Sequence, residues 1–232
     1  MNWIILMAGG DGQRMKAGTN KAFLQLLGKP IFFYTLKTLE EMDLIDQIII
    51  AARVVDKQEW QKMIKKSGFQ KIVKLFPAAK TRQDSTRAIL KWFQGQAAAN
   101  DLIAVHNAVN PLVQPGEIKA VFKAAQRFGA ALLAMPARDT VKISNQNAVV
   151  KETPLRQFAW YAQTPQVGRF DLMLQAFQKA KQDNFQGTDD SQLLERIGAK
   201  VKIVPCSPEN FKITYSQDLF LAEKILKERR KK

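Results

Sequence analysis

The sequence predicts an α/β protein with a Rossmann-like, mostly parallel sheet and helices on both of its faces. Short apolar runs alternate with amphipathic stretches along most of the 232 residues, as in strand–helix–strand units. The apolar runs are continuous and rich in β-branched residues, which is typical of parallel strands buried on both faces. The length and the hydrophobic content of 46% fit one sizeable core. We therefore expect residues 1–232 to form a single domain.

Six apolar runs are predicted strands, because each is short and bounded by polar or turn-forming residues. They are Trp3–Met7, Gln47–Ala52, Lys71–Phe76, Asp101–His106, Ala130–Met135 and Lys200–Val204. Seven amphipathic stretches are predicted helices, namely 31–42, 56–67, 82–94, 116–128, 169–181, 188–197 and 216–229. We expect Thr188 to cap the helix over 188–197, with Asp189 and Asp190 in its first turn.

Residues 137–159 interrupt this alternation. Two half-apolar runs, Thr140–Ile143 and Ala148–Lys151, flank the polar cluster Ser144–Asn147, and Asn and Ser are typical of turns between paired strands. A hairpin cannot bury its apolar side alone. We therefore expect an inserted β-hairpin over 137–159 that protrudes from the domain as an arm and packs on another surface.

The chain is strongly basic, with a formal net charge of +15. This charge attracts anionic ligands of any kind. A nucleic-acid-binding protein is one alternative, but no recognisable nucleic-acid module accompanies the charge, so we expect no nucleic-acid partner. The single cysteine, Cys206, fits a reducing compartment. No apolar run is long enough to span a membrane, and no signal segment precedes the first predicted strand. We expect a cytoplasmic protein without a membrane partner.

The most informative motif directly follows the first predicted strand. It reads Met7-Ala8-Gly9-Gly10-Asp11-Gly12-Gln13-Arg14-Met15, and Asn20-Lys21 follow it. Glycines let backbone N–H groups approach an anion closely, and Arg14 and Lys21 add two positive charges. The loop lacks the third glycine of a dinucleotide-binding fingerprint and the Gly-Lys-Ser/Thr of a P-loop. We predict a polyphosphate site, although the spacing alone fits a plain glycine-rich turn equally well.

This loop resembles the signature of nucleotidyltransferases with a Rossmann-like sheet. The whole chain resembles the 2-C-methyl-D-erythritol 4-phosphate cytidylyltransferase family of non-mevalonate isoprenoid biosynthesis, and it is also similar to ribitol-5-phosphate cytidylyltransferases. Six further blocks of the family pattern recur in order along nearly the whole chain. They are Arg82–Ser85, Val105–Pro111, Pro136–Lys142, Trp160–Gln166, Thr188–Asp190 and Pro208–Thr214. The ordered series is far more specific than any single block.

The resemblance implies transfer of a cytidylyl group from CTP to 2-C-methyl-D-erythritol 4-phosphate with release of pyrophosphate. It also implies Mg²⁺, held mainly by the CTP phosphates, and a homodimer in which the arm embraces the second subunit. The implied catalytic residues are Arg14, Lys21 and Lys212. The implied nucleotide-binding residues are Ala8, Gly9, Gly10, Gly12, Arg82, Ser85 and Ala108. The implied acceptor-binding residues are Asn107, Asn110, Thr140, Arg156 and Thr188.

Three departures from the family pattern bear on specificity. Asn107 stands where the family has an acidic residue, Asn110 where it has an arginine, and Ala78-Ala79 where a glycine pair usually meets the cytosine. Loss of a hydrogen bond to a charged group costs about 1.5–3 kcal/mol. A cytidylyltransferase for ribitol 5-phosphate or another polyol phosphate therefore stays an alternative. So does a catalytically weakened, nucleotide-binding paralogue.

The single histidine, His106, is expected to be packed at the end of its strand and to take no part in the chemistry. Transfer of a phosphate-linked group depends on positioning and charge neutralisation and needs no general base. With one histidine and one cysteine in the chain, we expect no zinc cluster. Any metal would be a hard cation held by oxygen ligands.

Overall fold

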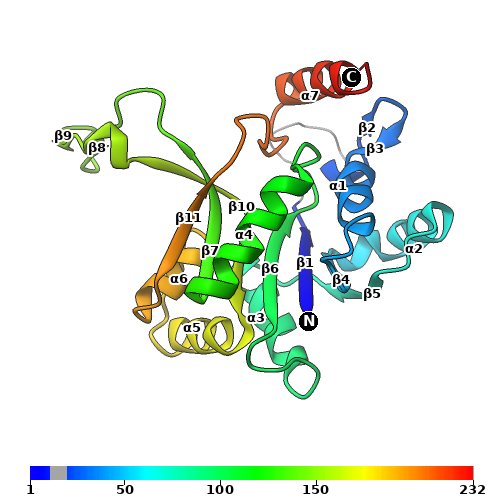
Figure 1. The fold of residues 1–232 in the computed structure, drawn as a ribbon, viewed down its shortest axis with the longest axis horizontal. Coiled ribbons are helices and arrows are strands. Elements are labelled where there is room, and N and C mark those ends of the chain that lie inside the picture. The colour runs from blue at the N-terminus through cyan, green and yellow to red at the C-terminus, as the bar shows by residue number, and fades with distance from the viewer. Residues whose placement is uncertain (11–19, 232) are drawn as a thin grey trace.

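The computed structural model describes residues 1–10 and 20–231 of the chain and centres on a seven-stranded sheet (Figure 1). In the order in which they pair, the strands are β11 (Val201–Pro205), β7 (Ala130–Pro136), β10 (Trp160–Arg169), β6 (Leu102–Asn107), β1 (Asn2–Ala8), β4 (Gln47–Ala52) and β5 (Ile72–Pro77). Six of them match the predicted strands to within one residue at each end. Within this sheet, every pairing that does not involve β10 is parallel, which confirms the mostly parallel sheet.

Strand β10 is the element that the sequence analysis did not identify as a strand. It runs antiparallel to both of its neighbours, β6 and β7. Its pairing with β7 is irregular between Ala162 and Gln166, and Pro165 lies within this stretch. Its first residues are partly exposed whereas the later ones are buried. The strand therefore shows neither the alternation of a half-buried strand nor the continuous apolar run of a buried one.

Helices cover both faces of the sheet, as predicted. One face packs against α1 (Ile31–Glu40), α2 (Lys57–Ser67), α4 (Pro115–Phe128) and α7 (Ser216–Arg229). The other packs against α3 (Arg82–Phe93), α5 (Phe170–Gln182) and α6 (Asp190–Arg196). Successive residues of β1 alternate between the two cores: Ile4 and Leu6 point to the first, Trp3 and Ile5 to the second. None of the helices in the described ranges is long and apolar enough to cross a membrane.

The predicted cap of α6 was wrong by one residue. The N-cap is Asp189, whose side chain accepts a hydrogen bond from the backbone N–H of Gln192. Thr188 lies before the cap, and its backbone N–H donates to Gln192 Oε1 over 2.8 Å. An aspartate caps at least as well as a threonine and adds a negative charge at the positive end of the helix, which explains the shift.

The segment 137–159 forms a hairpin that extends away from the sheet (Figure 1). Its paired strands, β8 (Ile143–Ser144) and β9 (Val150–Glu152), are shorter than predicted. The reason is a turn in which the Asn145 side chain accepts from the backbone N–H groups of Asn147 and Val149. A 3₁₀ turn, η4 (Arg156–Phe158), follows, and the Phe158 ring is 72% exposed. The hairpin thus presents apolar side chains that nothing in the described chain covers.

The parallel register brings four strand ends into one row. Ala8 of β1 pairs with Ala52 of β4, Ala52 pairs with Pro77 of β5, and Met7 pairs with Asn107 of β6. The short elements η2 (Lys21–Phe23), β2 (Gln25–Leu26), β3 (Lys29–Pro30) and η3 (Val54–Asp56) complete this part of the chain. In parallel α/β sheets ligands bind at this carboxyl edge.

Candidate active site

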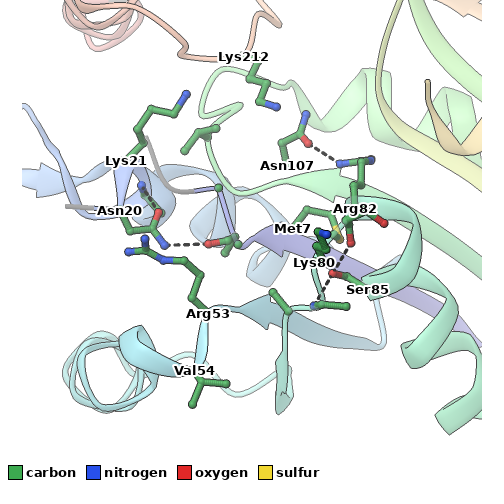
Figure 2. A pocket seen from close by; sticks show the side chains of 18 residues that line it. Met7, Asn20, Lys21, Arg53, Val54, Lys80, Arg82, Ser85, Asn107 and Lys212 are labelled. Atoms are coloured by element: carbon green, nitrogen blue, oxygen red, sulfur yellow. Dashed lines mark hydrogen bonds between the residues drawn. The ribbon is translucent and has the colours of Figure 1, made fainter. Parts of the chain in front are cut away.

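A cavity of about 670 Å³ opens at the carboxyl edge of the sheet (Figure 2). It is lined by residues that follow β1, β4, β5 and β6, and by one residue that precedes α7. The lining residues are Met7, Ala8, Gly9, Gly10, Asn20, Lys21, Ala22, Arg53, Val54, Ala78, Ala79, Lys80, Thr81, Arg82, Ser85, Asn107, Val109 and Lys212. Five of these are basic, and none of the described lining residues is acidic. The cavity therefore fits a polyanionic ligand.

Most residues that the sequence analysis connected with the nucleotide and its phosphates meet in this cavity. They are Ala8, Gly9, Gly10, Lys21, Arg82, Ser85 and Lys212. Gly12 and Arg14 lie outside the described residues. Ala108 is fully buried rather than at the cavity wall, and its carbonyl accepts a hydrogen bond from the Thr35 hydroxyl over 3.0 Å. Its contribution is to hold α1 against the end of β6.

The loops after β1 and β5 close over the end of β4 and form the floor of the cavity. A Cβ atom on Gly9 would lie only 2.7 Å from the Cβ of Ala78, so Gly9 is needed for this close approach. The backbone N–H of Ala79 donates to Ser85 Oγ over 2.9 Å, and this hydroxyl donates to the Thr81 carbonyl over 2.8 Å. Ala78 and Ala79 thus take a fixed position at the start of α3.

Lys21 is held at the cavity by the residue before it. Asn20 is buried, and its amide nitrogen donates both to the Ala8 carbonyl over 2.8 Å and to Asp56 Oδ2 over 2.7 Å. Its amide oxygen accepts from the backbone N–H of Ala22 over 3.0 Å. Asn20 therefore joins the end of β1 to η2 and fixes the backbone on both sides of Lys21, which is only 6% exposed.

Arg53 closes the same network from the end of β4. Its guanidinium donates to both carboxylate oxygens of Asp56, over 2.7 and 2.8 Å. Burial raises the pKa of Asp56, but the hydrogen bonds from Arg53 and Asn20 outweigh burial, and the net pKa lies below the usual value. The sequence analysis missed Arg53, Asp56 and Asn20 as site residues. The position of Arg53 directly after a predicted strand was the signal that could have identified it.

A second network lies on the opposite side of the cavity, at the right of Figure 2. Arg82 Nε and Nη2 donate to Asp190 Oδ2 over 3.1 and 2.7 Å, and Nη1 donates to Asn107 Oδ1 over 2.7 Å. Asp190 is 2% exposed. The next residue, Gln83, accepts from the backbone N–H of Gly187 over 2.9 Å. The start of α3 is thereby attached to the turn that precedes α6.

The two asparagines that depart from the family pattern belong to a buried chain of amides. Asn107 Nδ2 donates to Asn110 Oδ1 over 3.1 Å and to Thr164 Oγ1 over 3.2 Å. Asn110 donates to Asn210, which in turn donates to the Thr164 carbonyl over 3.0 Å. Asn110 is fully buried and does not line the cavity. Only Asn107 of this pair is placed where it could face a ligand.

The remaining candidates for the acceptor lie apart from the cavity lining. Thr140 and Arg156 are exposed on the hairpin, where Arg156 donates to the Arg138 carbonyl over 3.3 Å. Thr188 borders a separate hollow of about 420 Å³ between α6 and strands β7, β10 and β11. Within one copy of the chain these three side chains do not join the cavity that holds Lys21.

His106 is fully buried, as predicted. Its Nδ1 is hydrogen-bonded to Thr164 Oγ1 over 2.8 Å, and no described residue pairs with its Nε2. Burial, reinforced by the positive charge of Arg82, lowers the pKa of His106 to about 3. The imidazole is therefore neutral at physiological pH.

Comparisons with known proteins agree on one family. The model described as 2-C-methyl-D-erythritol 4-phosphate cytidylyltransferase matches residues 2–228. A relative of that name from Alkaliphilus oremlandii is 37% identical over 230 residues, which cover 98% of this chain and 95% of that protein. One from Pelotomaculum thermopropionicum is 34% identical over 226 residues, 97% of this chain and 94% of that protein.

Solved structures give the same result. The crystal structure of 4-diphosphocytidyl-2C-methyl-D-erythritol synthase from Anaerococcus prevotii has a TM-score of 0.84 and 27% identity, and the match covers 98% of this chain and 96% of that one. The 2-C-methyl-D-erythritol 4-phosphate cytidylyltransferase from Francisella tularensis has a TM-score of 0.81 and 29% identity, with 96% and 98% covered. The similarity extends over nearly the full length of each chain.

The burial of His106 predicts a stability that falls in acid. In the unfolded chain His106 takes up a proton below pH 6.5, whereas in the folded chain it stays unprotonated down to about pH 3. Unfolding is therefore increasingly favoured as the pH falls through this window. At pH 5 this difference in pKa lowers the free energy of unfolding by about 2 kcal/mol. Denaturant titrations at pH 7 and pH 5 should show that the parent loses about this much more stability than His106→Gln. Equal losses of stability in the parent and in His106→Gln would contradict the lowered pKa of His106.

Proposed function

The chain belongs to the 2-C-methyl-D-erythritol 4-phosphate cytidylyltransferase family, and on this premise we propose that it transfers a cytidylyl group from CTP to 2-C-methyl-D-erythritol 4-phosphate. The observation that carries the proposal is the cavity itself. It lies at the carboxyl edge of the sheet, has glycines on one side, and gathers Lys21, Arg82 and Lys212 from distant parts of the chain. We place the enzyme in the cytoplasm, in keeping with its single cysteine.

The reaction joins two phosphates. An oxygen of the acceptor phosphate attacks the α-phosphorus of CTP and forms a new P–O bond. The bond from the α-phosphorus to the bridging oxygen breaks, and pyrophosphate leaves with that electron pair. Negative charge is spread over the phosphate oxygens in the transition state, so the protein contributes mainly positioning and fixed positive charge. A phosphate nucleophile is already ionised near neutral pH, so no base is required.

In our proposal Lys21 and Lys212 stabilise the reacting phosphates from the two sides of the cavity mouth, and Arg14, outside the described residues, assists them. Figure 2 shows both lysines directed toward the same opening. The backbone of Gly9 and Gly10 offers N–H groups to the nucleotide. A lysine ammonium suits this role because it carries three N–H donors on a flexible stem and can follow the phosphate oxygens as they move.

We propose that the nucleotide lies between the glycine loop and Ala79, Lys80 and Ser85, with its base over Ala78 and Ala79. The acceptor then enters on the Asn107 side. Thr140 and Arg156 lie on the exposed hairpin and do not line the cavity of their own chain, which supports a homodimer in which the arm completes the site of the second subunit. In this arrangement Thr188 faces the incoming arm.

Mg²⁺ is the proposed cofactor. The described residues contain no group of three His, Cys, Asp or Glu side chains that could hold a metal. Mg²⁺ nevertheless fits this site, because it retains several waters and is often held by substrate phosphates with few protein ligands. When bound with CTP, the ion neutralises charge on the triphosphate.

The function is tested by measuring pyrophosphate release with CTP, ATP, GTP and UTP, each in combination with 2-C-methyl-D-erythritol 4-phosphate and with ribitol 5-phosphate. We expect rapid turnover for CTP with the methylerythritol acceptor and at least tenfold lower kcat/KM for the other combinations. Preference for ribitol 5-phosphate would identify the acceptor alternative. Inactivity with every pair would favour a nucleotide-binding paralogue.

Removing the Lys21 charge should slow the reaction more than it weakens CTP binding. Loss of one preorganised charge-stabilising donor typically costs about 10²–10³ in rate. We expect Lys21→Met to lower the single-turnover rate by a factor in this range, whereas the Kd for CTP rises less than tenfold. Lys37→Met is the matched control, since Lys37 is exposed and pairs with Glu41 on α1. A normal single-turnover rate in Lys21→Met would remove Lys21 from the mechanism.

The shared site predicts complementation between inactive variants. Lys21→Ala and Arg156→Ala should each be inactive as homodimers. After random mixing half of the dimers are mixed, and each has one intact site of two, so about a quarter of the parent activity should return. Mixing Lys21→Ala with Lys212→Ala is the control that should restore nothing, because both lysines line the cavity of one chain. No recovery in the first mixture would show that Arg156 does not act across the dimer.

A further inference from the structure

A chain of hydrogen bonds leads from the end of β4 to the backbone around Lys21. Asp56 is its centre: Oδ2 accepts from both Asn20 Nδ2 and Arg53 Nε, and Oδ1 accepts from Arg53 Nη2. Asn20 is 3% exposed and Asp56 9%. The guanidinium thus holds the carboxylate in one orientation, and the carboxylate holds the Asn20 amide. Figure 2 shows Asn20 between Lys21 and Arg53.

The far end of the Lys21 side chain also has a defined contact. Its Nζ donates to the Ile213 carbonyl over 3.4 Å, and the backbone N–H of Ile213 donates to the Val109 carbonyl over 2.9 Å. Ile213 directly follows Lys212, the second lysine of the proposed mechanism. The Lys21 side chain therefore reaches from η2 to the segment before α7, and the place of its ammonium depends on where its backbone lies. A shift of about 1 Å in a positioned group can slow a reaction by about 10²-fold.

The backbone of Asn20 has a conformation that a proline could hold without hydrogen bonds. Its φ is −62° and its ψ is 125°, and a proline ring fixes φ at about −65°. Among the described residues, none accepts a hydrogen bond from the backbone N–H of Asn20. The Asn20 side chain instead fixes this position through its hydrogen bonds with Ala8, Ala22 and Asp56. Asp56 is therefore needed here only while residue 20 depends on its side chain.

We propose that Asn20 and Asp56 are positioning residues for the transfer reaction. Asp56 orients the Asn20 amide, and Asn20 sets the backbone from which Lys21 reaches the phosphates. The inference rests on the proposed function and goes beyond it, because it makes a carboxylate that does not line the cavity responsible for part of the rate. The pair acts on the rate of transfer, whereas the residues that bind the substrates stay in place.

Removing the Asn20 side chain tests the first step. Asn20→Ala should lower the single-turnover rate at saturating substrates by about tenfold, while the KM values for CTP and the acceptor change by less than about threefold. Asn20→Pro should restore most of the lost rate, because the ring holds φ without the amide. A parent-like rate in Asn20→Ala, or a rate in Asn20→Pro no higher than in Asn20→Ala, would overturn the inference.

Asp56→Ala tests the second step in two backgrounds. In the parent it should lower the single-turnover rate by about tenfold. In Asn20→Pro, where residue 20 no longer donates to the carboxylate, it should lower the rate by less than about twofold. Equal losses in the two backgrounds would show that Asp56 does not act through Asn20 and would overturn its role. This comparison decides the matter even if Asn20→Ala does not fold.

Asp101→Ala is the matched control for the loss of a buried aspartate. Asp101 is 8% exposed and accepts from Trp3 Nε1 and from the backbone N–H of Ala98, but it precedes β6 at the end of the sheet away from the cavity. Its replacement should lower the melting temperature and leave the single-turnover rate within about twofold of the parent. A rate loss as large as that of Asp56→Ala would overturn the inference. Failure of the proposed function looks different, since the parent chain would then release no pyrophosphate from CTP and 2-C-methyl-D-erythritol 4-phosphate.

Discussion

The parallel pairing of β1 with both β4 and β6 is the constraint on which the rest of the structure depends. Because the three strands are buried on both faces by helices, their register is fixed by packing. Their carboxyl ends, together with that of β5, then form one row. Segments far apart in the sequence must leave the sheet at this edge, and the cationic cavity is the consequence.

The charges of the cavity are positioned by polar groups set behind them. Asn20 joins β1 to η2 around Lys21, and Asp56 neutralises Arg53 away from the opening. On the other side Asp190 anchors Arg82. The acidic partners are buried or nearly so, whereas the basic groups reach the cavity wall. This arrangement holds the basic groups in place at the cavity wall, while their acidic partners lie behind them.

Local sequence signals explain which parts could be predicted. Continuous β-branched runs identified six strands, and the glycine loop with Lys21 identified the cavity. Strand β10 was not predicted because its sequence lacks a regular hydrophobic pattern. Pro165 lies within the stretch where its pairing with β7 is irregular. The Asn20–Asp56–Arg53 network and the burial of Asn110 depend on contacts between distant segments, which no local pattern reveals. The family resemblance could name Asn110 as an acceptor ligand, but its full burial behind Asn107 is a property of the fold.

In the proposed reaction, transfer depends on fixed positive charge and requires no titrating base. The single histidine is buried and neutral, and the cavity lining supplies lysine and arginine side chains from several segments of the chain. The most direct measurement is the single-turnover rate from pH 7 to pH 9 with saturating CTP and acceptor, where the substrate phosphates are already ionised. A rate that changes by less than about twofold is the result expected for pure charge stabilisation. A tenfold change per pH unit, or a bell-shaped profile centred in this range, would contradict it.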